Sequence, residues 1–126
     1  VLFRSIHINI PGGIPVDGPS AGIAIATAVY SAILELPIDN KVAMTGEISL
    51  LGTVNPIGGV NAKILAAQKA GANRVIIPAD NWNESFLNYE GIDVIKVSNI
   101  KEVLDVCILN NDKTKIDILS AKAKEL

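Results

Sequence analysis

The sequence is poor in the residue types on which many metal and redox sites depend. It contains one histidine, one cysteine and one tryptophan, and aromatic residues make up 4% of its 126 residues. A lone cysteine cannot form an internal disulfide, and no cysteine or histidine pattern has the spacing of a zinc site. We therefore expect this chain to hold no metal and no cofactor. A single cysteine also fits a reducing compartment, and we expect a cytoplasmic protein.

Basic residues are scarce in the first half of the chain. Residues 1–62 contain only Arg4 and Lys41 as basic residues, and the net charge of the whole chain is −2. Nucleic-acid binding depends on clustered lysine and arginine side chains that neutralise phosphates. The sequence therefore argues against a nucleic-acid partner for this domain.

Long charge-free stretches are also missing. The longest covers residues 18–34, which is shorter than the roughly 20 residues that a helix needs to cross a bilayer, and it contains Ser20, Thr27 and Ser31. We interpret it as a buried helix rather than a membrane span, and expect no membrane contact. No signal peptide is visible at the start of the sequence.

Hydrophobic residues make up 49% of the chain and charged residues 19%, which excludes a disordered chain. We expect one domain over residues 1–126, with a core over about 5–109 and a polar, helical tail over 110–126. Hydrophobic periodicity and breakers predict alternating elements. The expected strands are 5–10, 41–45, 48–54, 74–77 and 93–97, and the expected helices are 20–36, 60–70, a short one near 83–87, and 100–109. This alternation predicts an α/β fold.

Ser20 lies where a loop becomes the long apolar helix. The first backbone N–H groups of a helix lack partners, so a serine hydroxyl there has ready oxyanion donors beside it. Gly18 and Gly22 on either side allow another backbone or a substrate to approach closely. The alternative is that Ser20 simply caps the helix, with Asp17 and Pro19 as ordinary residues of a helix start.

A serine nucleophile needs a base. A triad with histidine would have to use His7 and Asp17, but His7 could equally be a strand residue of no catalytic role. Lysine is the other base, provided that burial or nearby positive charge favours its neutral form. On the expected helix 60–70, Lys63 falls on the alanine-rich border of the buried face. The alternative is a lysine whose stem covers apolar surface while its amine reaches water.

Residues 45–47 (T-G-E) form a further polar cluster at the end of an expected strand. Thr45 could hold a neutral lysine amine in place, with Glu47 nearby. The alternative is a plain turn without a catalytic role.

Three segments together resemble the proteolytic domain of Lon-type proteases. They are residues 15–22 (P-V-D-G-P-S-A-G), residues 43–48 (A-M-T-G-E-I) and residues 52–63 (G-T-V-N-P-I-G-G-V-N-A-K), and the resemblance extends over roughly residues 6–109. It implies the Lon protease α/β fold, related to that of GHMP kinases. It also implies a Ser-Lys dyad, with Ser20 as nucleophile, Lys63 as general base and Thr45 supporting the lysine.

The sequence departs from the family pattern at two positions. His7 matches the first histidine of an H-x-H-x-P pattern, but Asn9 stands at the second. Val16 stands where many members carry lysine, a change that bears on substrate binding. Asp17, Gly18 and Glu47 keep the pattern and are expected to support the site.

The resemblance also implies partners. The chain has no P-loop motif, so we expect an AAA+ ATPase module elsewhere in a longer chain, a homo-hexamer, and polypeptide substrates. Because the sequence begins at Val1, directly before the strand that leads to the serine loop, we expect the most N-terminal strands of the family domain to be missing.

Two other functions are weighed against a serine endopeptidase. One is a non-catalytic, Lon-like interaction domain, as in some DNA-repair ATPases, but such a scaffold needs neither Ser20 nor Lys63. The other is a small-molecule kinase of the related fold, for which Gly12 and Gly13 are a weak phosphate-binding signal.

Overall fold

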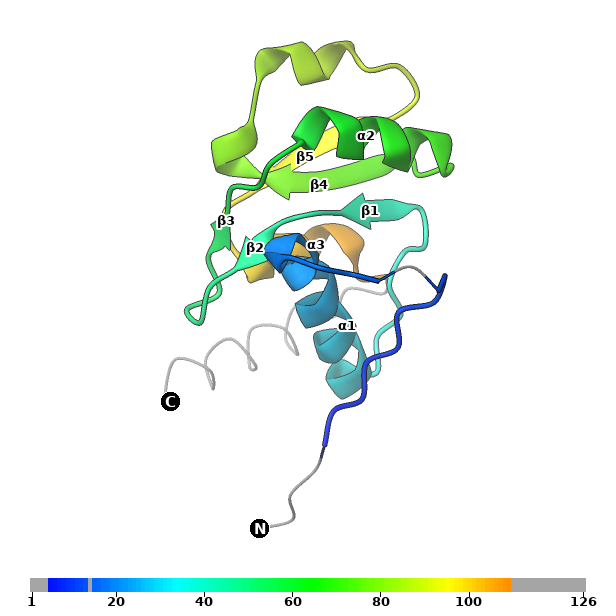
Figure 1. Cartoon of the computed structure of the whole chain (residues 1–126), viewed down its shortest axis with the longest axis vertical. Coiled ribbons are helices and arrows are strands. Elements are labelled where there is room, and N and C mark those ends of the chain that lie inside the picture. The colour runs from blue at the N-terminus through cyan, green and yellow to red at the C-terminus, as the bar shows by residue number, and fades with distance from the viewer. Residues whose placement is uncertain (1–4, 14, 110–126) are drawn as a thin grey trace.

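A three-stranded parallel sheet lies at the centre of this computed structural model, which describes residues 5–13 and 15–109 (Figure 1). The strands β1 (Val42–Met44), β4 (Arg74–Pro78) and β5 (Asp93–Val97) follow the order β1-β4-β5. β4 therefore has a strand on each side, and its residues 75–78 are buried. Parallel strands need crossover connections, and here helices fill them, so the mixed α/β class expected from the sequence is confirmed.

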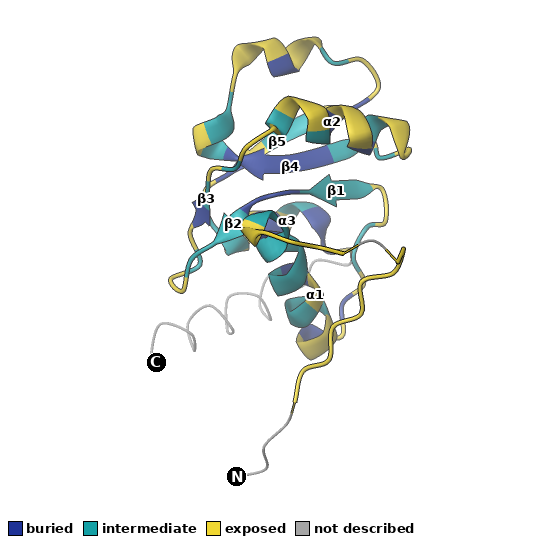
Figure 2. Ribbon diagram, in the orientation of Figure 1, coloured by how far each residue is buried: buried dark blue, intermediate teal, exposed yellow. Residues whose placement is uncertain are grey.

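Each face of the sheet carries its own apolar core. One face packs against α1 (Gly22–Leu34) and α3 (Ile100–Cys107), and Ile76 is its buried centre. The other packs against α2 (Val60–Lys69) and the 3-10 helix η3 (Glu84–Asn88), with Val75 and Ile77 pointing to that side. Successive side chains of a strand alternate between faces, so β4 contributes to both cores (Figure 2).

Most of the predicted elements are present with slightly different ends. The predictions for β1, α2, β4 and β5 are confirmed, and Gly71 follows α2 with a φ of 89°, a backbone shape that suits glycine after a helix. α3 ends at Cys107 rather than residue 109, and the short helix near 83–87 is a 3-10 helix. The expected tail helix over 110–126 lies outside the described residues. None of the helices in the described part of the chain is both long and apolar enough to cross a bilayer.

The helix expected over 20–36 is shorter and begins differently. A 3-10 helix, η1 (Pro19–Ala21), precedes α1, so Ser20 lies inside a helical turn and does not cap one. At the other end Glu35 adopts a left-handed conformation with φ 56°, and its N–H bonds to the carbonyl of Ser31. The hydroxyl of Ser31 then donates to the carbonyl of Leu36 at 2.6 Å, which closes the end of the helix.

The strand expected over 48–54 is a hairpin instead. Residues 47–48 (β2, Glu47–Ile48) pair antiparallel with residues 54–55 (β3, Val54–Asn55), and the chain reverses between them. The hydroxyl of Ser49 accepts the N–H groups of Leu51 and Thr53, both at 3.2 Å, and Gly52 adopts φ 82°. Side-chain capping of this kind competes with extended structure, so Gly52 lies in a turn and not within a strand.

The strand expected over 5–10 is absent. These residues are exposed and carry no strand assignment, and Ile6, Ile8 and Ile10 are 67%, 52% and 47% exposed (Figure 2). Alternation makes a segment suited to a sheet, but a strand exists only where a neighbouring strand takes its hydrogen bonds. No strand in the described part of the chain pairs with this segment.

The start of α1 lies unusually close to the segment that follows β1. Gly46 donates its N–H to the carbonyl of Ser20 at 2.9 Å and accepts the N–H of Ile23 at 3.1 Å. Glycine at both contact points makes this possible. A β-carbon at Gly22 would lie 3.0 Å from the backbone nitrogen of Ile48, and one at Gly46 would be tighter still.

We predict that Gly46→Ala destabilises the fold. The added β-carbon would lie 2.9 Å from Cγ1 of Val54 and 3.2 Å from Cδ1 of Ile23, both in the core. Overpacking of this kind costs about 1–3 kcal/mol, which urea unfolding would measure. Gly58→Ala is the control, because a β-carbon there meets nothing within 4 Å. Equal loss of stability in both variants would contradict the packing argument.

Asp39 ties the loop before β1 to the first residue of β4. Its carboxylate accepts the N–H of Lys41 at 2.8 Å and forms an ion pair with Arg74 at 2.7 Å. Arg74 also donates to the carbonyl of Val106 in α3, at 3.2 Å. The Lys41 N–H, and after it the Arg74 guanidinium, lower the pKa of Asp39 below its usual value.

We predict that Asp39→Asn lowers the melting temperature at neutral pH, and that this deficit shrinks in acid. A carboxyl with a lowered folded-state pKa stabilises the fold above its unfolded pKa, about 3.9, and loses that contribution as the pH falls through the folded value. Thermal melts from pH 7 to pH 3 would show the two proteins converging. Asp80→Asn, at an exposed position, should give a small difference that does not vary in this way.

Candidate active site

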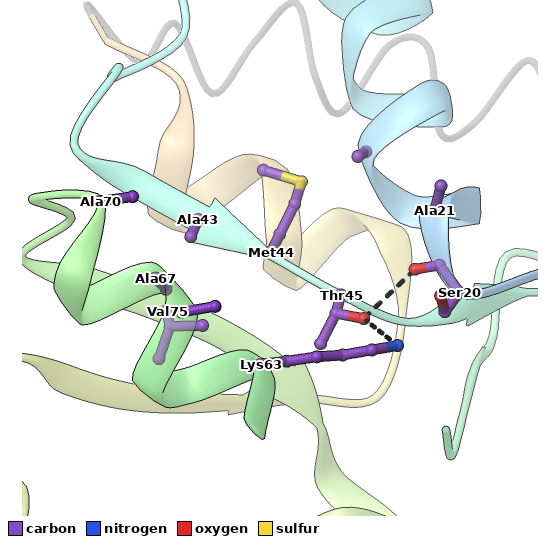
Figure 3. Close-up of a pocket in the computed structure, with 11 residues that line it drawn as sticks. Ser20, Ala21, Ala43, Met44, Thr45, Lys63, Ala67, Ala70 and Val75 are labelled. Atoms are coloured by element: carbon purple, nitrogen blue, oxygen red, sulfur yellow. Dashed lines mark hydrogen bonds between the residues drawn. The ribbon is translucent and has the colours of Figure 1, made fainter. Parts of the chain in front are cut away.

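A cavity of about 410 Å³ opens between the start of α1, the strand β1 and the helix α2 (Figure 3). Its polar side chains come from Ser20, Thr45 and Lys63, one from each of these elements. The remaining lining residues are small or apolar: Ala21, Ala24, Ala43, Met44, Ala66, Ala67, Ala70 and Val75. The structure thus brings together three of the residues singled out in the sequence, in a setting that is otherwise apolar.

Ser20 reaches the cavity because of the turn in which it lies. Gly18 precedes η1 with φ 83°, a conformation that glycine adopts readily, and Pro19 occupies the first helical position. The carbonyl of Ser20 is bonded to Gly46, while its hydroxyl has no hydrogen-bond partner among the described residues. The interpretation of Ser20 as a helix cap is therefore wrong for this structure, and its hydroxyl is left for another role.

Thr45 connects the serine to the lysine. It follows β1 directly, is 7% exposed, and donates its N–H to the carbonyl of Ile76 in β4. Its hydroxyl donates to the carbonyl of Ser20 at 3.3 Å and accepts from Nζ of Lys63 at 3.3 Å (Figure 3). A hydroxyl donates once and accepts readily, so one side chain satisfies both contacts, and the cluster is more than a plain turn.

Lys63 lies in the first turn of α2 and is half-buried. Its side chain extends from the start of the helix, and its amine points toward Thr45 and Ser20 (Figure 3). The described residues place no carboxylate within ion-pair distance of the amine, so no acid competes with Thr45 for it.

His7, Asp17 and Glu47 are not joined to this cluster. His7 Nε2 hydrogen bonds to the hydroxyl of Ser5 at 2.9 Å, and Asp17 accepts the N–H of Gly18 at 2.8 Å. Glu47 lies in β2, opposite Asn55. No hydrogen bond among the described residues links any of the three to Ser20 or Lys63, so the structure does not assemble a Ser-His-Asp triad. Their supporting roles stay predictions.

The thiol of Cys107 is also a nucleophilic group, but this residue ends α3 and is buried in the core. Burial raises the pKa of its thiol to about 11. The thiolate is the reactive form of cysteine, so this residue is protonated and inert at neutral pH. Ser20, by contrast, lines the cavity.

Reasoning from the sequence alone did not identify two features of the site. The alanines of α2 and β1 that line the cavity have no chemistry by which a sequence would reveal them. Asn81, in the 3-10 helix η2 (Ala79–Asn81), hydrogen bonds to both backbone groups of Ile57, in the loop before α2. No local pattern predicts a partner 24 residues away.

Comparison with known proteins gives a consistent result. Residues 3–110 match the family described as the Lon protease (S16) C-terminal proteolytic domain. The chain is 58% identical over 105 residues to Lon protease 2 of Bacillus subtilis. The aligned region covers 83% of this chain and 19% of that protein. It is 50% identical over 125 residues to the archaeal Lon protease of Archaeoglobus fulgidus, covering 96% of this chain and 20% of that protein.

The chain therefore spans about a fifth of these relatives, and the family match covers most of the chain. The resemblance seen in three separate sequence motifs and the match over residues 3–110 agree. This chain belongs to the family of Lon protease C-terminal proteolytic domains.

Proposed function

We propose that this domain is a serine endopeptidase in which Ser20 is the nucleophile, Lys63 the general base and Thr45 the residue that holds the lysine amine. The observation that carries the proposal is the continuous contact from Lys63 through Thr45 to Ser20 within one cavity. Protease relatives at 58% and 50% identity support it. A non-catalytic domain gives no reason for these three polar groups to meet in an otherwise apolar cavity.

The proposed reaction has two halves. The neutral amine of Lys63 takes the hydroxyl proton of Ser20 as Oγ attacks the peptide carbonyl, and the tetrahedral intermediate then collapses with the proton passing to the leaving amine. A water molecule next attacks the acyl-serine ester, again with Lys63 as base. The ester bond breaks, Ser20 regains its proton, and a carboxylic acid is released.

The oxyanion needs a donor from the turn that carries Ser20. The N–H groups of Gly22 and Ile23 are already donated, to the carbonyls of Pro19 and Gly46. Pro19 has no N–H to offer, so we assign the N–H of Ser20, next to the attacking hydroxyl, as a donor from this turn. The apolar walls of the cavity keep water away from the ion that forms, which strengthens this interaction.

The wider setting is also part of the proposal. We expect this domain to act within a longer chain that carries an AAA+ ATPase module, in a cytoplasmic homo-hexamer that degrades unfolded or damaged proteins. We expect no cofactor in the domain itself. We also expect the relationship to the GHMP-kinase fold and additional strands upstream of residue 5.

We predict that Ser20→Ala abolishes peptide hydrolysis, by about 10³-fold or more, while the domain stays folded. The assay is fluorogenic peptide cleavage by the intact protease, together with a thermal melt. Ser85→Ala, at an exposed position of η3, is the matched control and should keep full activity. Activity near wild type in Ser20→Ala would remove Ser20 as the nucleophile.

We predict that Lys63→Arg loses peptide hydrolysis almost as completely as Ser20→Ala. A guanidinium keeps its positive charge and cannot give up its proton near neutral pH, so it cannot act as the base. Lys69→Arg is the control, since Lys69 lies exposed in the last turn of the same helix. Turnover of both variants would be compared at saturating peptide. An active Lys63→Arg protease would show that the lysine contributes charge alone and is not the base.

A further inference from the structure

The loop that leads into α2 has little structure of its own to hold it in place. It covers residues 56–59, most of which are exposed, and it ends in two consecutive glycines. Gly59 precedes the helix with φ 68°, and no side chain caps the first turn. Glycine has more backbone freedom than any other residue, so a contact from outside the loop is needed to fix where α2 begins.

Asn81 provides that contact. Its Oδ1 accepts the N–H of Ile57 at 2.8 Å, and its Nδ2 donates to the carbonyl of the same residue at 2.9 Å. Both bonds have good length, and together they fix the orientation of the Ile57 peptide groups as well as their distance. Asn81 is half-buried, where such bonds are stronger than in open water.

Asn81 and Thr45 occupy corresponding places in the fold. It lies in η2, which directly follows β4, just as Thr45 directly follows β1. These two strands are parallel neighbours, and the carboxyl ends of parallel strands lie at the same edge of a sheet. The residue that holds the lysine amine and the residue that holds the start of the lysine helix are therefore built on one edge.

Apolar packing alone fixes the position of Lys63 less closely than these hydrogen bonds do. Ile64 and Ala67 bury one face of α2 in the core with Val75 and Ile77, but such contacts are non-directional. Lys63 is the fourth residue of α2, and its N–H bonds to the carbonyl of Gly59 at 3.2 Å. A movement of the loop is thus passed directly to the backbone of Lys63.

We propose that Asn81 is a positioning residue for the reaction: by clamping Ile57 it sets the first turn of α2 and so holds the Lys63 amine against Thr45 and beside Ser20. The inference rests on the proposed function of Lys63 as base. A displacement of about 1 Å at a reacting group costs on the order of a hundredfold in rate, so a clamp on Ile57, six residues before Lys63 in the sequence, has a measurable effect.

The test is Asn81→Ala in the intact protease, with Asn83→Ala as the matched control. Asn83 lies two residues away, and its side chain also accepts one backbone N–H, that of Ser85 at 2.9 Å, but it serves η3 and not the loop before α2. Exhaustive labelling of Ser20 with a serine-reactive phosphonate counts the folded sites. We expect kcat per labelled site to fall between about tenfold and a hundredfold in Asn81→Ala, with KM within about twofold, and to stay unchanged in Asn83→Ala.

A purely structural role gives a different result. Asn81→Ala would then lower the number of labelled sites or the melting temperature, with kcat per labelled site unchanged, and that outcome would overturn the proposal. Hydrogen exchange adds a readout independent of activity. We expect the amides of residues 57–63 to exchange faster in Asn81→Ala than in Asn83→Ala, and equal exchange would also overturn the clamp.

The outcomes separate this inference from the proposed function. If Ser20→Ala keeps its activity, the proposed function is wrong and the kinetic role of Asn81 falls with it, while hydrogen exchange still decides whether Asn81 orders the loop. If Ser20→Ala is inactive and Asn81→Ala turns over at the wild-type rate per site, only the role of Asn81 is wrong.

Discussion

Two hydrogen bonds at Gly46 hold the serine turn against the end of the central sheet, and the geometry of the site depends on them. One joins the Gly46 N–H to the carbonyl of Ser20, and the other joins the Gly46 carbonyl to the N–H of Ile23. The absence of a side chain at Gly46 lets Ile23 and Val54 close over it. Because Thr45 is the preceding residue, the same contact that anchors the serine turn also places the threonine hydroxyl between serine and lysine.

Polar side chains around the cavity gather at one edge of the sheet. Thr45 and Asn81 follow neighbouring parallel strands, and their side chains reach two parts of the same segment, the amine of Lys63 and the loop that precedes it. β4 is buried on both faces. Thr45 is hydrogen bonded to this buried strand, and the loop before α2 is held to the same edge by Asn81.

Local signals were sufficient for the parts of the fold in which sequence and packing agree. Val60–Lys69 and Gly71 carry both the helical period and the residue that ends a helix, and the helix begins and ends close to where the sequence predicted. The features that the sequence did not predict share a cause: each depends on a partner that the local pattern does not reveal. The segment 5–10 alternates but has no strand to pair with among the described residues. The Ser49 hydroxyl caps a turn where a strand was predicted, and Asn81 binds a residue 24 positions earlier.

The alanines that line the cavity give it a property distinct from its apolar character. All six, at residues 21, 24, 43, 66, 67 and 70, present only a β-carbon to the space beside Ser20 and Lys63. Alanine has no rotamers, so these walls have no side-chain entropy to lose when a ligand is bound. The shape of the cavity is set by the positions of two helices and a strand, and its fit to a bound chain is adjusted by movement of whole elements rather than by rotation of side chains.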